Sequence, residues 1–478
     1  MSRFSIASIS IGDLIAQADV SATISDSSVV VTGMTQDSRA VESGDLFCCI
    51  RGENFDGHRF ALQAVAAGAS ALLVDQVVSG IPDSVAVITV ANVRATVGAV
   101  ASAAFGHPSR SLTMVGITGT NGKTSTAAMV ASILRAAGKS TEVLGTLSGA
   151  RTTPEAIDLQ AFLQRCVSDN VTHVVMEVSS HALAQDRVSG IMFDVSVFTN
   201  ISRDHLDYHK TDEAYFAAKA KLFTPELSRC GIINSDDPRG QLLLDVAPIR
   251  MTSFAHTDAT DVTIRVDNIF FRWRGLNIAL PMGGVFSLMN AIAALTTCSE
   301  LNIDENSMID GCAQLAQIPG RFESIANTHG IGVVVDYAHT PDGLKEVISS
   351  ARALCTGRLI VVFGCGGDRD AGKRPLMGNA AQEADMLFIT SDNPRSEDPM
   401  AIIDAIVSGV TKSTIDVRIE VDRAQAIASA ILEARRDDIV VIAGKGHEST
   451  QEVAGVHHPF NDVDVAKSAL SHKKGSES

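Results

Sequence analysis

Residues 112–137 of the chain read LTMVGITGTNGKTSTAAMVASILRAA. The first part of this stretch, residues 112–117, is apolar and predicts a buried strand. Residues 119–123 form a glycine-rich loop, and residues 124–137 are alanine-rich and predict a helix. A strand that passes through a glycine loop into a helix is the context that a nucleotide phosphate loop requires. The stretch therefore predicts an α/β fold with a phosphate site at the end of one strand.

The loop offers several kinds of contact to a phosphate. Gly119 and Gly122 let the backbone wrap around it, and the following helix start adds oriented amides. Lys123 can reach terminal phosphates, and the Thr124 hydroxyl can bind Mg²⁺. The spacing departs from the common G-x-x-x-x-G-K-T pattern, because Ile117 stands five positions before Gly122. The flanking strand and helix nevertheless disfavour the alternative, a glycine-rich turn with a solvated lysine.

Strand-then-loop units recur along the rest of the chain. They lie at residues 174–178, 195–199, 333–335, 359–363, 386–389 and 439–442. Short strands at residues 28–31, 45–50 and 71–74 and a helix at residues 58–67 predict a smaller α/β unit before them. We therefore expect three α/β domains: a small N-terminal one at residues 1–108, a central mostly parallel phosphate-loop domain at 109–320, and a Rossmann-like one at 321–478.

Composition limits the classes of partner. At 478 residues the chain exceeds the size of a single core, and its net charge of -16 disfavours binding to nucleic acid or anionic lipid. No stretch reaches the length of a membrane span, and the first residues do not resemble a signal peptide. The eight cysteines lack C-x-x-C spacing, so we expect reduced thiols in a cytoplasmic protein. We also expect the protein to be a monomer.

Two polar residues follow predicted strands and form a candidate metal centre. Glu177 ends one strand and His205 follows another, so an acid and an imidazole can meet at one sheet edge and bind Mg²⁺. Taken alone, each residue is more often a hydrogen-bonded structural group. Lys219 lies in a helical stretch, residues 215–223, where a lysine is normally a solvated face residue.

The segment T-G-T-N-G-K-T at residues 118–124 resembles the ATP loop of the Mur ligases and the related folylpolyglutamate synthases. Motifs in the family's order extend the resemblance from residue 35 to residue 448. The resemblance implies ATP contacts at Gly119, Thr120, Asn121, Gly122, Lys123, Thr124, Ser125, Asn290, Arg321 and Asp336. It implies catalytic roles for Lys123, Glu177, His205, Lys219 and Arg321, and a Mg²⁺ site at Thr124, Glu177, His205 and Lys219, with Lys219 carrying a carbamate.

The same resemblance implies two further substrate sites. A UDP-muramoyl dipeptide is expected at Gln36, Ser38, Glu53, Asn54, Phe55, Thr152, Thr153, Ser179, Gln185 and Arg187. Meso-diaminopimelate is expected at Arg369, Asp392, Asn393, Pro394, Arg395, Gly444 and Glu448. Arg395 suits the additional carboxylate of diaminopimelate, which lysine lacks. Two positions depart from the family pattern, since Ser287 and Arg151 stand where relatives usually or sometimes carry asparagine.

The resemblance therefore implies an ATP-dependent ligase that joins diaminopimelate to the D-glutamate γ-carboxylate of the muramoyl dipeptide through an acyl phosphate. One alternative is a lysine-adding or folate-glutamylating relative, which predicts a non-basic residue in place of Arg395 or a folate pocket in place of the N-terminal domain. A second alternative is an ATP-binding regulator without turnover, against which Lys123, Glu177, His205 and Lys219 argue.

Overall fold

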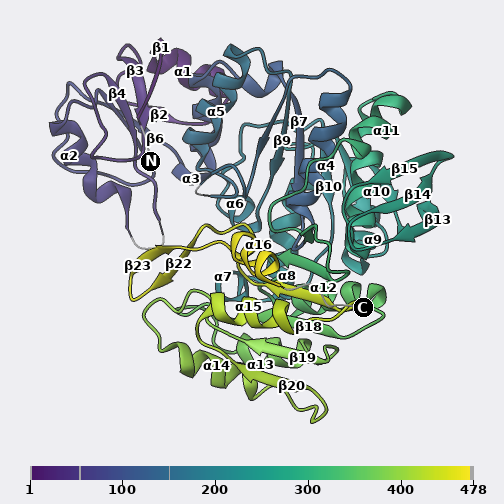
Figure 1. The fold of residues 1–478 in the computed structure, drawn as a ribbon. Helices are drawn as coiled ribbons and strands as arrows, with labels where there is room; N and C mark the ends of the chain where they lie inside the picture. The colour runs from purple at the N-terminus through teal and green to yellow at the C-terminus, as the bar shows by residue number, and fades with distance from the viewer. Residues whose placement is uncertain (1–2, 53–54, 150, 474–478) are drawn as a thin grey trace.

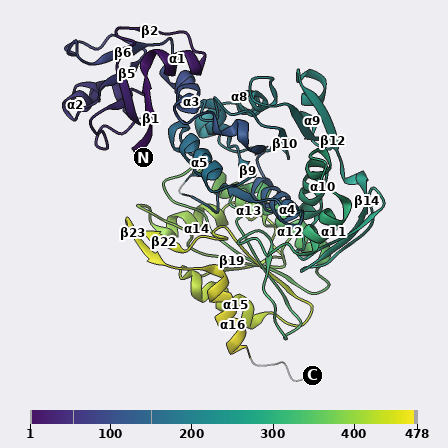
Figure 2. The ribbon, with the colours of Figure 1, turned by 90° about the horizontal axis from the view of Figure 1, so that it is seen from above.

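The computed structural model describes residues 3–52, 55–149 and 151–473. Within these residues, three six-stranded sheets follow one another along the chain, with a three-stranded sheet and a two-stranded hairpin added. Figure 1 shows the N-terminal sheet beside the central one, with the C-terminal sheet below. Figure 2, a view from above, shows the N-terminal part to one side of the molecule, at the upper left. The predicted three-part α/β architecture is confirmed, whereas the boundaries at residues 108 and 320 stay predictions.

The N-terminal sheet has the order β1-β3-β4-β5-β6-β2, with β3 to β6 parallel and antiparallel strands at both edges. Its strands are β1 (Phe4–Ser10), β2 (Thr23–Ile24), β3 (Val30–Thr35), β4 (Asp45–Cys48), β5 (Ala71–Val74) and β6 (Ala86–Thr89), and its helices are α1 (Ile11–Ala18), α2 (Ala61–Ala66) and α3 (Val93–Ala104). The loops that follow β3 and β4 carry the expected nucleotide residues Gln36, Ser38 and Phe55. Glu53 and Asn54 lie outside the described residues.

The central sheet is parallel throughout, in the order β12-β11-β10-β7-β9-β8. Its strands are β7 (Thr113–Thr118), β8 (Thr141–Leu144), β9 (His173–Glu177), β10 (Val195–Phe198), β11 (Cys230–Asn234) and β12 (Arg250–Phe254). Its helices are α4 (Lys123–Ala136), α5 (Ala156–Ser168), α6 (Ser180–Ala184), α7 (Leu206–His209), α8 (Asp212–Ala220) and α9 (Pro238–Val246). The chain continues from β7 to β8 and β9 on one side and to β10 on the other, so a ligand crevice is expected at the carboxyl end of β7.

An antiparallel sheet and two helices complete the central part. They are β13 (Ala259–Ile264), β14 (Ile269–Trp273), β15 (Leu276–Leu280), α10 (Val285–Glu300) and α11 (Glu305–Ala313). Helices α10 and α11 pack against α4, so the helix that begins at the phosphate loop is buried on several sides. This packing fixes the loop against the core.

The C-terminal sheet has the order β16-β17-β21-β18-β19-β20, parallel except for β16. Its strands are β16 (Glu323–Ser324), β17 (Gly332–Asp336), β18 (Leu359–Phe363), β19 (Met386–Ile389), β20 (Asp416–Ile419) and β21 (Ile439–Ala443). Its helices are α12 (Pro341–Leu354), α13 (Lys373–Ala380), α14 (Pro399–Val407), α15 (Arg423–Glu433) and α16 (Asp462–His472). A hairpin of β22 (Thr450–Val453) and β23 (Val456–Pro459) follows β21.

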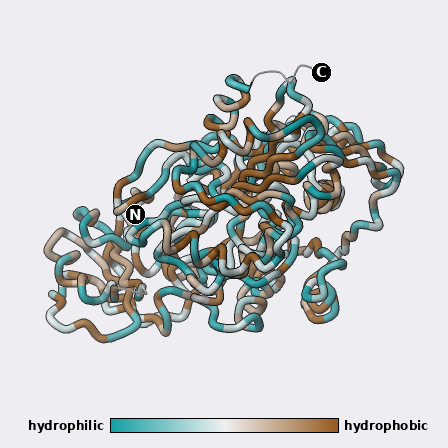
Figure 3. Tube along the Cα trace, turned by 60° about the horizontal axis from the view of Figure 1, so that its bottom comes forward, coloured by the Kyte–Doolittle hydropathy of each residue, from teal (hydrophilic) through white to brown (hydrophobic). Residues whose placement is uncertain are grey.

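Each six-stranded sheet carries hydrophobic clusters on both faces. Every residue of β18 and of β21 is buried, as expected for parallel strands covered by helices on both sides. Figure 3 shows hydrophobic segments gathered in the interior and hydrophilic ones on outer loops. The polar residues that follow the strands therefore stand at the edge of a rigid core.

Several predicted elements differ in their bounds. The strands expected at residues 359–363 and 386–389 match β18 and β19. The strand expected at residues 28–31 is displaced, because β3 gains its burial and its pairing with β1 and β4 through residues 30–35. The helix expected at residues 58–67 is divided into a 3₁₀ turn, capped by Asp56, and α2.

Candidate active site

A cavity of about 270 Å³ opens beyond the carboxyl end of β7, and we name it the phosphate-loop cavity. Every residue expected to contact ATP lines it: Gly119, Thr120, Asn121, Gly122, Lys123, Thr124, Ser125, Asn290, Arg321 and Asp336. Asn290 comes from α10, and Arg321 and Asp336 come from the C-terminal part. The cavity therefore joins the central and C-terminal parts of the chain.

The loop itself is held in a conformation that favours glycine. Gly119 has φ +153° and Gly122 has φ +86°, and a Cβ at Gly122 would stand 2.4 Å from Oδ1 of Asn290. The backbone N–H of Asn121 donates to Oδ1 of Asn200, beyond the end of β10, over 2.9 Å. Contacts from two elements thus fix the loop.

Glu177 is the centre of a buried hydrogen-bond network. The side chain is 1% exposed and accepts from the Thr124 hydroxyl over 3.0 Å and from the backbone N–H of Thr146 over 2.9 Å. Arg321 Nη2 donates to the same Thr124 hydroxyl over 3.1 Å. Because a buried carboxylate needs such donors, the network keeps an anionic oxygen pair beside the loop.

Two lysines point at the loop. Lys123 Nζ donates to the carbonyls of Gly119 and Thr120 over 2.9 and 2.8 Å, and Lys219 Nζ donates to the Gly119 carbonyl over 2.8 Å and lies over the Tyr215 ring. Burial lowers the pKa of both amines, and the pKa of Lys219 falls well below its ordinary value because the charge of Lys123 adds to burial. Neither amine forms an ion pair within the described residues. The pair suits an anionic ligand.

His205 stands between two cavities. Desolvation lowers its pKa to about 4 despite Asp204, whose carboxylate lies 3.3 Å from Nε2, so the imidazole is neutral at pH 7. Its ring centroid lies 4.8 Å from that of His181. A neutral imidazole has a lone pair for a metal ion or a proton.

A second cavity, of about 890 Å³, lies between the N-terminal and central parts, and we name it the N-terminal cavity. Its charged lining residues are Asp37, Arg39, Arg94, Arg151, Glu155 and Arg187. Four arginines against two carboxylates make this cavity cationic, although the whole chain has a net charge of -16. Such a local excess suits a polyanionic ligand.

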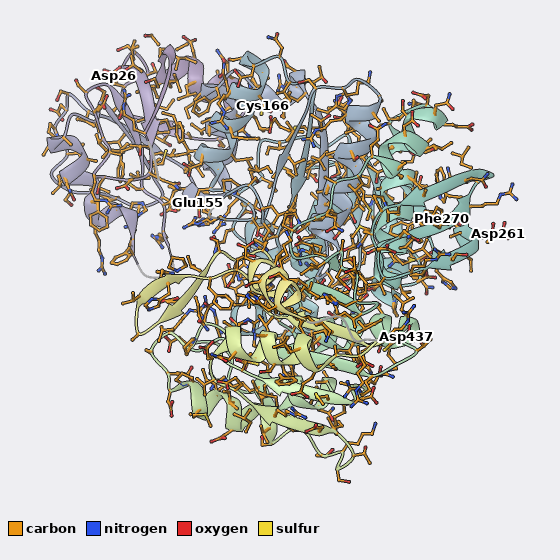
Figure 4. All side chains as sticks on the ribbon, in the orientation of Figure 1. Asp26, Glu155, Cys166, Asp261, Phe270 and Asp437 are labelled. Atoms are coloured by element: carbon orange, nitrogen blue, oxygen red, sulfur yellow. The ribbon has the colours of Figure 1, made fainter. Side chains whose placement is uncertain are left out.

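Glu155 connects three of those arginines. Its carboxylate lies 3.5 Å from Arg94 Nη1, 2.5 Å from Arg151 Nη1 and 3.0 Å from Arg187 Nη2. Arg94 belongs to α3, which packs against α5, so these ion pairs bridge the N-terminal and central parts. Figure 4 labels Glu155 at this boundary.

A third cavity, of about 800 Å³, lies beyond the carboxyl ends of the C-terminal strands, and we name it the C-terminal cavity. Six residues of the expected diaminopimelate site line it: Arg369, Asp392, Asn393, Arg395, Gly444 and Glu448. Pro394 does not line it. Asn393 Nδ2 donates to Glu448 over 2.8 Å, and the buried Lys445 Nζ donates to Oδ1 of Asn393 and to Glu448. This network holds the loop after β19 against the loop after β21.

The expected dipeptide residues divide between two cavities. Gln36, Ser38, Phe55, Gln185 and Arg187 line the N-terminal cavity, whereas Thr152 and Ser179 line the phosphate-loop cavity. Thr153 lines neither; it is buried and its hydroxyl donates to the Glu177 carbonyl over 2.9 Å. A dipeptide that reaches from the N-terminal cavity to the phosphate-loop cavity would pass these residues.

The expected metal ligands stand close to one another without forming a closed site. Thr124 is hydrogen-bonded to Glu177, and Lys219, His205 and Glu177 all line the phosphate-loop cavity. Among the described residues, no group of three His, Cys, Asp or Glu side chains is placed to hold a metal ion. Mg²⁺ in phosphoryl-transfer sites needs only one or two carboxylates besides water and phosphate oxygens, so this donor set fits Mg²⁺.

All eight cysteines are free, and all but Cys355 are buried. Burial raises the pKa of Cys365, in the C-terminal cavity, to about 12, so its thiol is a poor nucleophile. In the part of the chain that the structure covers, every helix is too short or too polar to span a bilayer.

Fold and site together define a Mur ligase. Three family models match successive parts of the chain: "Mur ligase family, catalytic domain" at residues 30–105, "Mur ligase middle domain" at 117–298 and "Mur ligase, glutamate ligase domain" at 320–446. The chain belongs to the Mur ligase family, as the resemblance predicted.

Individual relatives within and beyond this family show which members the chain is similar to. A UDP-N-acetylmuramoyl-L-alanyl-D-glutamate–2,6-diaminopimelate ligase of Syntrophomonas wolfei is 42% identical and covers 93% of this chain and 95% of its own. A solved structure with the same name is 32% identical, with a TM-score of 0.69, and covers 97% of this chain and 99% of its own. A folylpolyglutamate synthase of Mycobacterium tuberculosis is 22% identical over 72% of this chain, with a TM-score of 0.59, and shows a shared fold.

Sequence reasoning missed several residues of the site. Arg94 and Glu155 lie outside the motifs, and Glu452 belongs to a hairpin that was not expected. Lys445 lies within the G-K-G-H-E motif, whose Gly444 and Glu448 were chosen, and was itself passed over. A lysine between two glycines after a buried strand was the available signal.

Proposed function

We propose that this chain joins meso-2,6-diaminopimelate to the D-glutamate γ-carboxylate of UDP-N-acetylmuramoyl-L-alanyl-D-glutamate, with ATP converted to ADP and phosphate. One observation carries the proposal. The three cavities meet at two histidines: His205 lines the phosphate-loop and C-terminal cavities, and His181 lines the C-terminal and N-terminal cavities. A reaction that brings a nucleotide, an acid and an amine together needs such a junction.

The N-terminal cavity is the proposed site of the UDP-linked acid. Its size and its arginines suit a diphosphate and a carboxylate, and Phe55 and Phe60 offer aromatic faces. Arg187 Nη1 also donates to the Thr153 carbonyl, which orients the guanidinium beside Gln185. The acid end of the substrate would then extend toward Ser179 and the phosphate loop.

The proposed first step transfers the γ-phosphoryl group of ATP to the D-glutamate carboxylate, and an acyl phosphate and ADP result. Lys123 and Arg321 lie at the loop and stabilise the charge on the transferring group. Closure of the three parts around the cavities excludes water, which would hydrolyse the acyl phosphate.

In the proposed second step, the amine of diaminopimelate attacks the acyl phosphate from the C-terminal cavity. The tetrahedral intermediate collapses to an amide and phosphate. Arg395, with Asp392 and Asn393 nearby, holds the far end of the amine substrate. A lysine substrate would leave Arg395 without a carboxylate, which disfavours the lysine-adding alternative. The folate alternative rests on fold likeness alone.

Thr124, Glu177, His205 and a carbamate on Lys219 are the proposed Mg²⁺ ligands. When bound, the ion would neutralise phosphate charge. The buried amine of Lys219, which forms no ion pair with the residues that the structure describes, supports the carbamate, because CO₂ reacts with an uncharged amine. The free thiols support a cytoplasmic protein, and we propose that it is a monomer.

Phosphate release from ATP tests the proposal, with the UDP-linked dipeptide present and either meso-diaminopimelate or L-lysine as the amine. We expect release with diaminopimelate and a loss of that preference in Arg395→Ala. Equal use of lysine would overturn the assignment of the amine, and no release with either amine would favour a non-catalytic ATP-binding protein.

A further inference from the structure

The β22–β23 hairpin lies directly against the loop that carries Arg395. The backbone N–H of Arg395 donates to the Glu452 carbonyl over 3.2 Å, and the N–H of Ala454 donates to the Arg395 carbonyl over 2.7 Å. An isolated parallel bridge joins Arg395 to Val453. The match to the glutamate ligase domain ends at residue 446, so the hairpin lies outside the part that matches the family model.

The same strand contacts two more residues of the loop. Gln451 Nε2 donates to the Asp392 carbonyl over 2.6 Å, and the Glu452 N–H donates to Oδ1 of Asn393 over 2.9 Å. Strand β22 therefore binds three of the four residues in the D-N-P-R segment, at main-chain or amide atoms. The hairpin acts as a brace for this loop.

Arg395 needs such a brace because its backbone is strained. Its φ is +53°, in the left-handed region that side chains other than glycine rarely adopt. Both its N–H and its carbonyl are bonded to the hairpin. The hairpin therefore holds Arg395 in a conformation that an unbraced loop would tend to leave.

Glu452 also fixes the guanidinium. Arg395 Nε donates to Glu452 Oε2 over 3.1 Å, and Nη1 donates to the Gly367 carbonyl over 2.6 Å. Since a guanidinium is planar, these two bonds set its plane. Nη2 keeps its donors free of protein partners in the described part of the chain, and Arg395 lines the C-terminal cavity. The remaining donors can therefore serve a ligand carboxylate.

We propose that Glu452 is a positioning residue that aims Arg395 at the distal carboxylate of the amine substrate, so that the β22–β23 hairpin determines amine specificity. The inference rests on the proposed function. The two side chains are 22% and 26% exposed, so water still screens part of their attraction and the pair contributes only modestly to stability. The effect of Glu452 should therefore appear in substrate binding.

The test compares Glu452→Ala and Glu452→Gln with Glu433→Ala in steady-state kinetics and thermal unfolding. Glu433, at the end of α15, pairs with Arg418 of β20, which makes it a matched control outside the three cavities. We expect Glu452→Ala to raise the KM for meso-diaminopimelate about tenfold, with kcat within about twofold and Tm unchanged. Glu452→Gln keeps a neutral acceptor, so its effect should be smaller. The KM for L-lysine should not change.

A double variant separates this role from a general weakening of the hairpin. If Glu452 acts through Arg395, adding Glu452→Ala to Arg395→Ala should cost nothing further. Additive losses, or a KM for diaminopimelate that is unchanged in Glu452→Ala, would overturn the inference while leaving the ligase activity in place. A wild-type chain that shows no diaminopimelate-dependent phosphate release would overturn the proposed function and the inference together.

Discussion

The side-chain amine of Lys219 donates to the carbonyl of Gly119, 100 residues earlier in the sequence, over 2.8 Å. The contact joins helix α8 to the phosphate loop and buries the amine to 1% exposure. No carboxylate pairs with this amine within the described residues. A buried lysine without a counter-ion is costly, so its retention points to a function at the loop.

Replacement of Lys219 by alanine should lower kcat about 10²- to 10³-fold with little change in Tm, because the proposed carbamate, an anionic ligand for Mg²⁺ beside the transferring phosphate, is lost. Lys221→Ala is the control, since Lys221 is exposed and contacts Leu183 and Asp186 instead. Phosphate release measures both. Removal of dissolved CO₂ should slow the wild type, and bicarbonate should restore it. A rate indifferent to CO₂ would contradict the carbamate and leave the hydrogen bond from the amine to the Gly119 carbonyl as the explanation.

Gly122→Ala should raise the KM for ATP and also destabilise the protein. A side chain there must adopt φ +86° and displace Asn290, which stands 2.4 Å from the Cβ position. Gly138→Ala is the matched control, because Gly138 has φ +70° but no atom within 4 Å of its Cβ position. Gly138→Ala should lower the free energy of unfolding by about 1 kcal/mol through backbone strain and should not change the KM for ATP. Equal KM values in the two variants would show that Asn290 does not matter for ATP.

Glu155→Gln should destabilise the protein by about 3 kcal/mol, because Arg94, Arg151 and Arg187 lose a shared counter-ion in a largely buried place. Urea unfolding measures the change, with Glu433→Gln as a control whose single ion pair is more exposed than that of Glu155, and which is expected to lose less than about 1 kcal/mol. The UDP-linked dipeptide should restore part of the loss, since it brings anionic groups to the arginines. A loss equal to the control's would mean that the arginines do not depend on Glu155.

Glu346 should make stability depend on pH. It is exposed on α12 at the rim of the phosphate-loop cavity, yet desolvation by the cavity walls, followed by the charges of Asp336 and Asp342, raises its pKa from 4.5 to about 7. The folded state therefore binds this proton more tightly than the unfolded chain does. Its contribution to stability is complete below pH 4.5 and is lost as pH rises through 7.

Glu346→Gln should remove that dependence. The Tm of the variant minus the Tm of the wild type should increase between pH 4.5 and pH 8 and stay constant above pH 8. Glu305→Gln, on the exposed start of α11, is the control and should show no such trend. A Tm difference that stays constant with pH would mean that Glu346 titrates as it does in the unfolded chain.

Local sequence predicts the parts of the site that depend on local structure. The phosphate loop follows from one strand, two glycines and a helix start, and Glu177 follows from its place at the end of a buried strand. The burial of Lys219 could not be predicted from its helix, because it results from the approach of α8 to a loop 100 residues away. The shared ion pairs of Glu155 and the bond from Arg395 to Glu452 likewise depend on packing between distant segments.

The sheet of β13, β14 and β15 was missed for a related reason. Its strands alternate buried and exposed residues over only a few positions, as in Ile269–Trp273, and short patterns of this kind predict strands poorly. Tertiary packing against α11 stabilises them. The hairpin that braces Arg395 is mostly exposed and carries still less hydrophobic signal.

The proposed arrangement brings the UDP-linked acid, ATP and a dicarboxylic amine to one junction of the three cavities. Its most direct test is mass spectrometry of the product formed from ATP, the UDP-linked dipeptide and equal amounts of meso-diaminopimelate and L-lysine. We expect the dipeptide to gain diaminopimelate with loss of water and this product to predominate, about 10²-fold or more, over the lysine adduct. A predominant lysine adduct, or an unchanged dipeptide, would contradict the proposed arrangement.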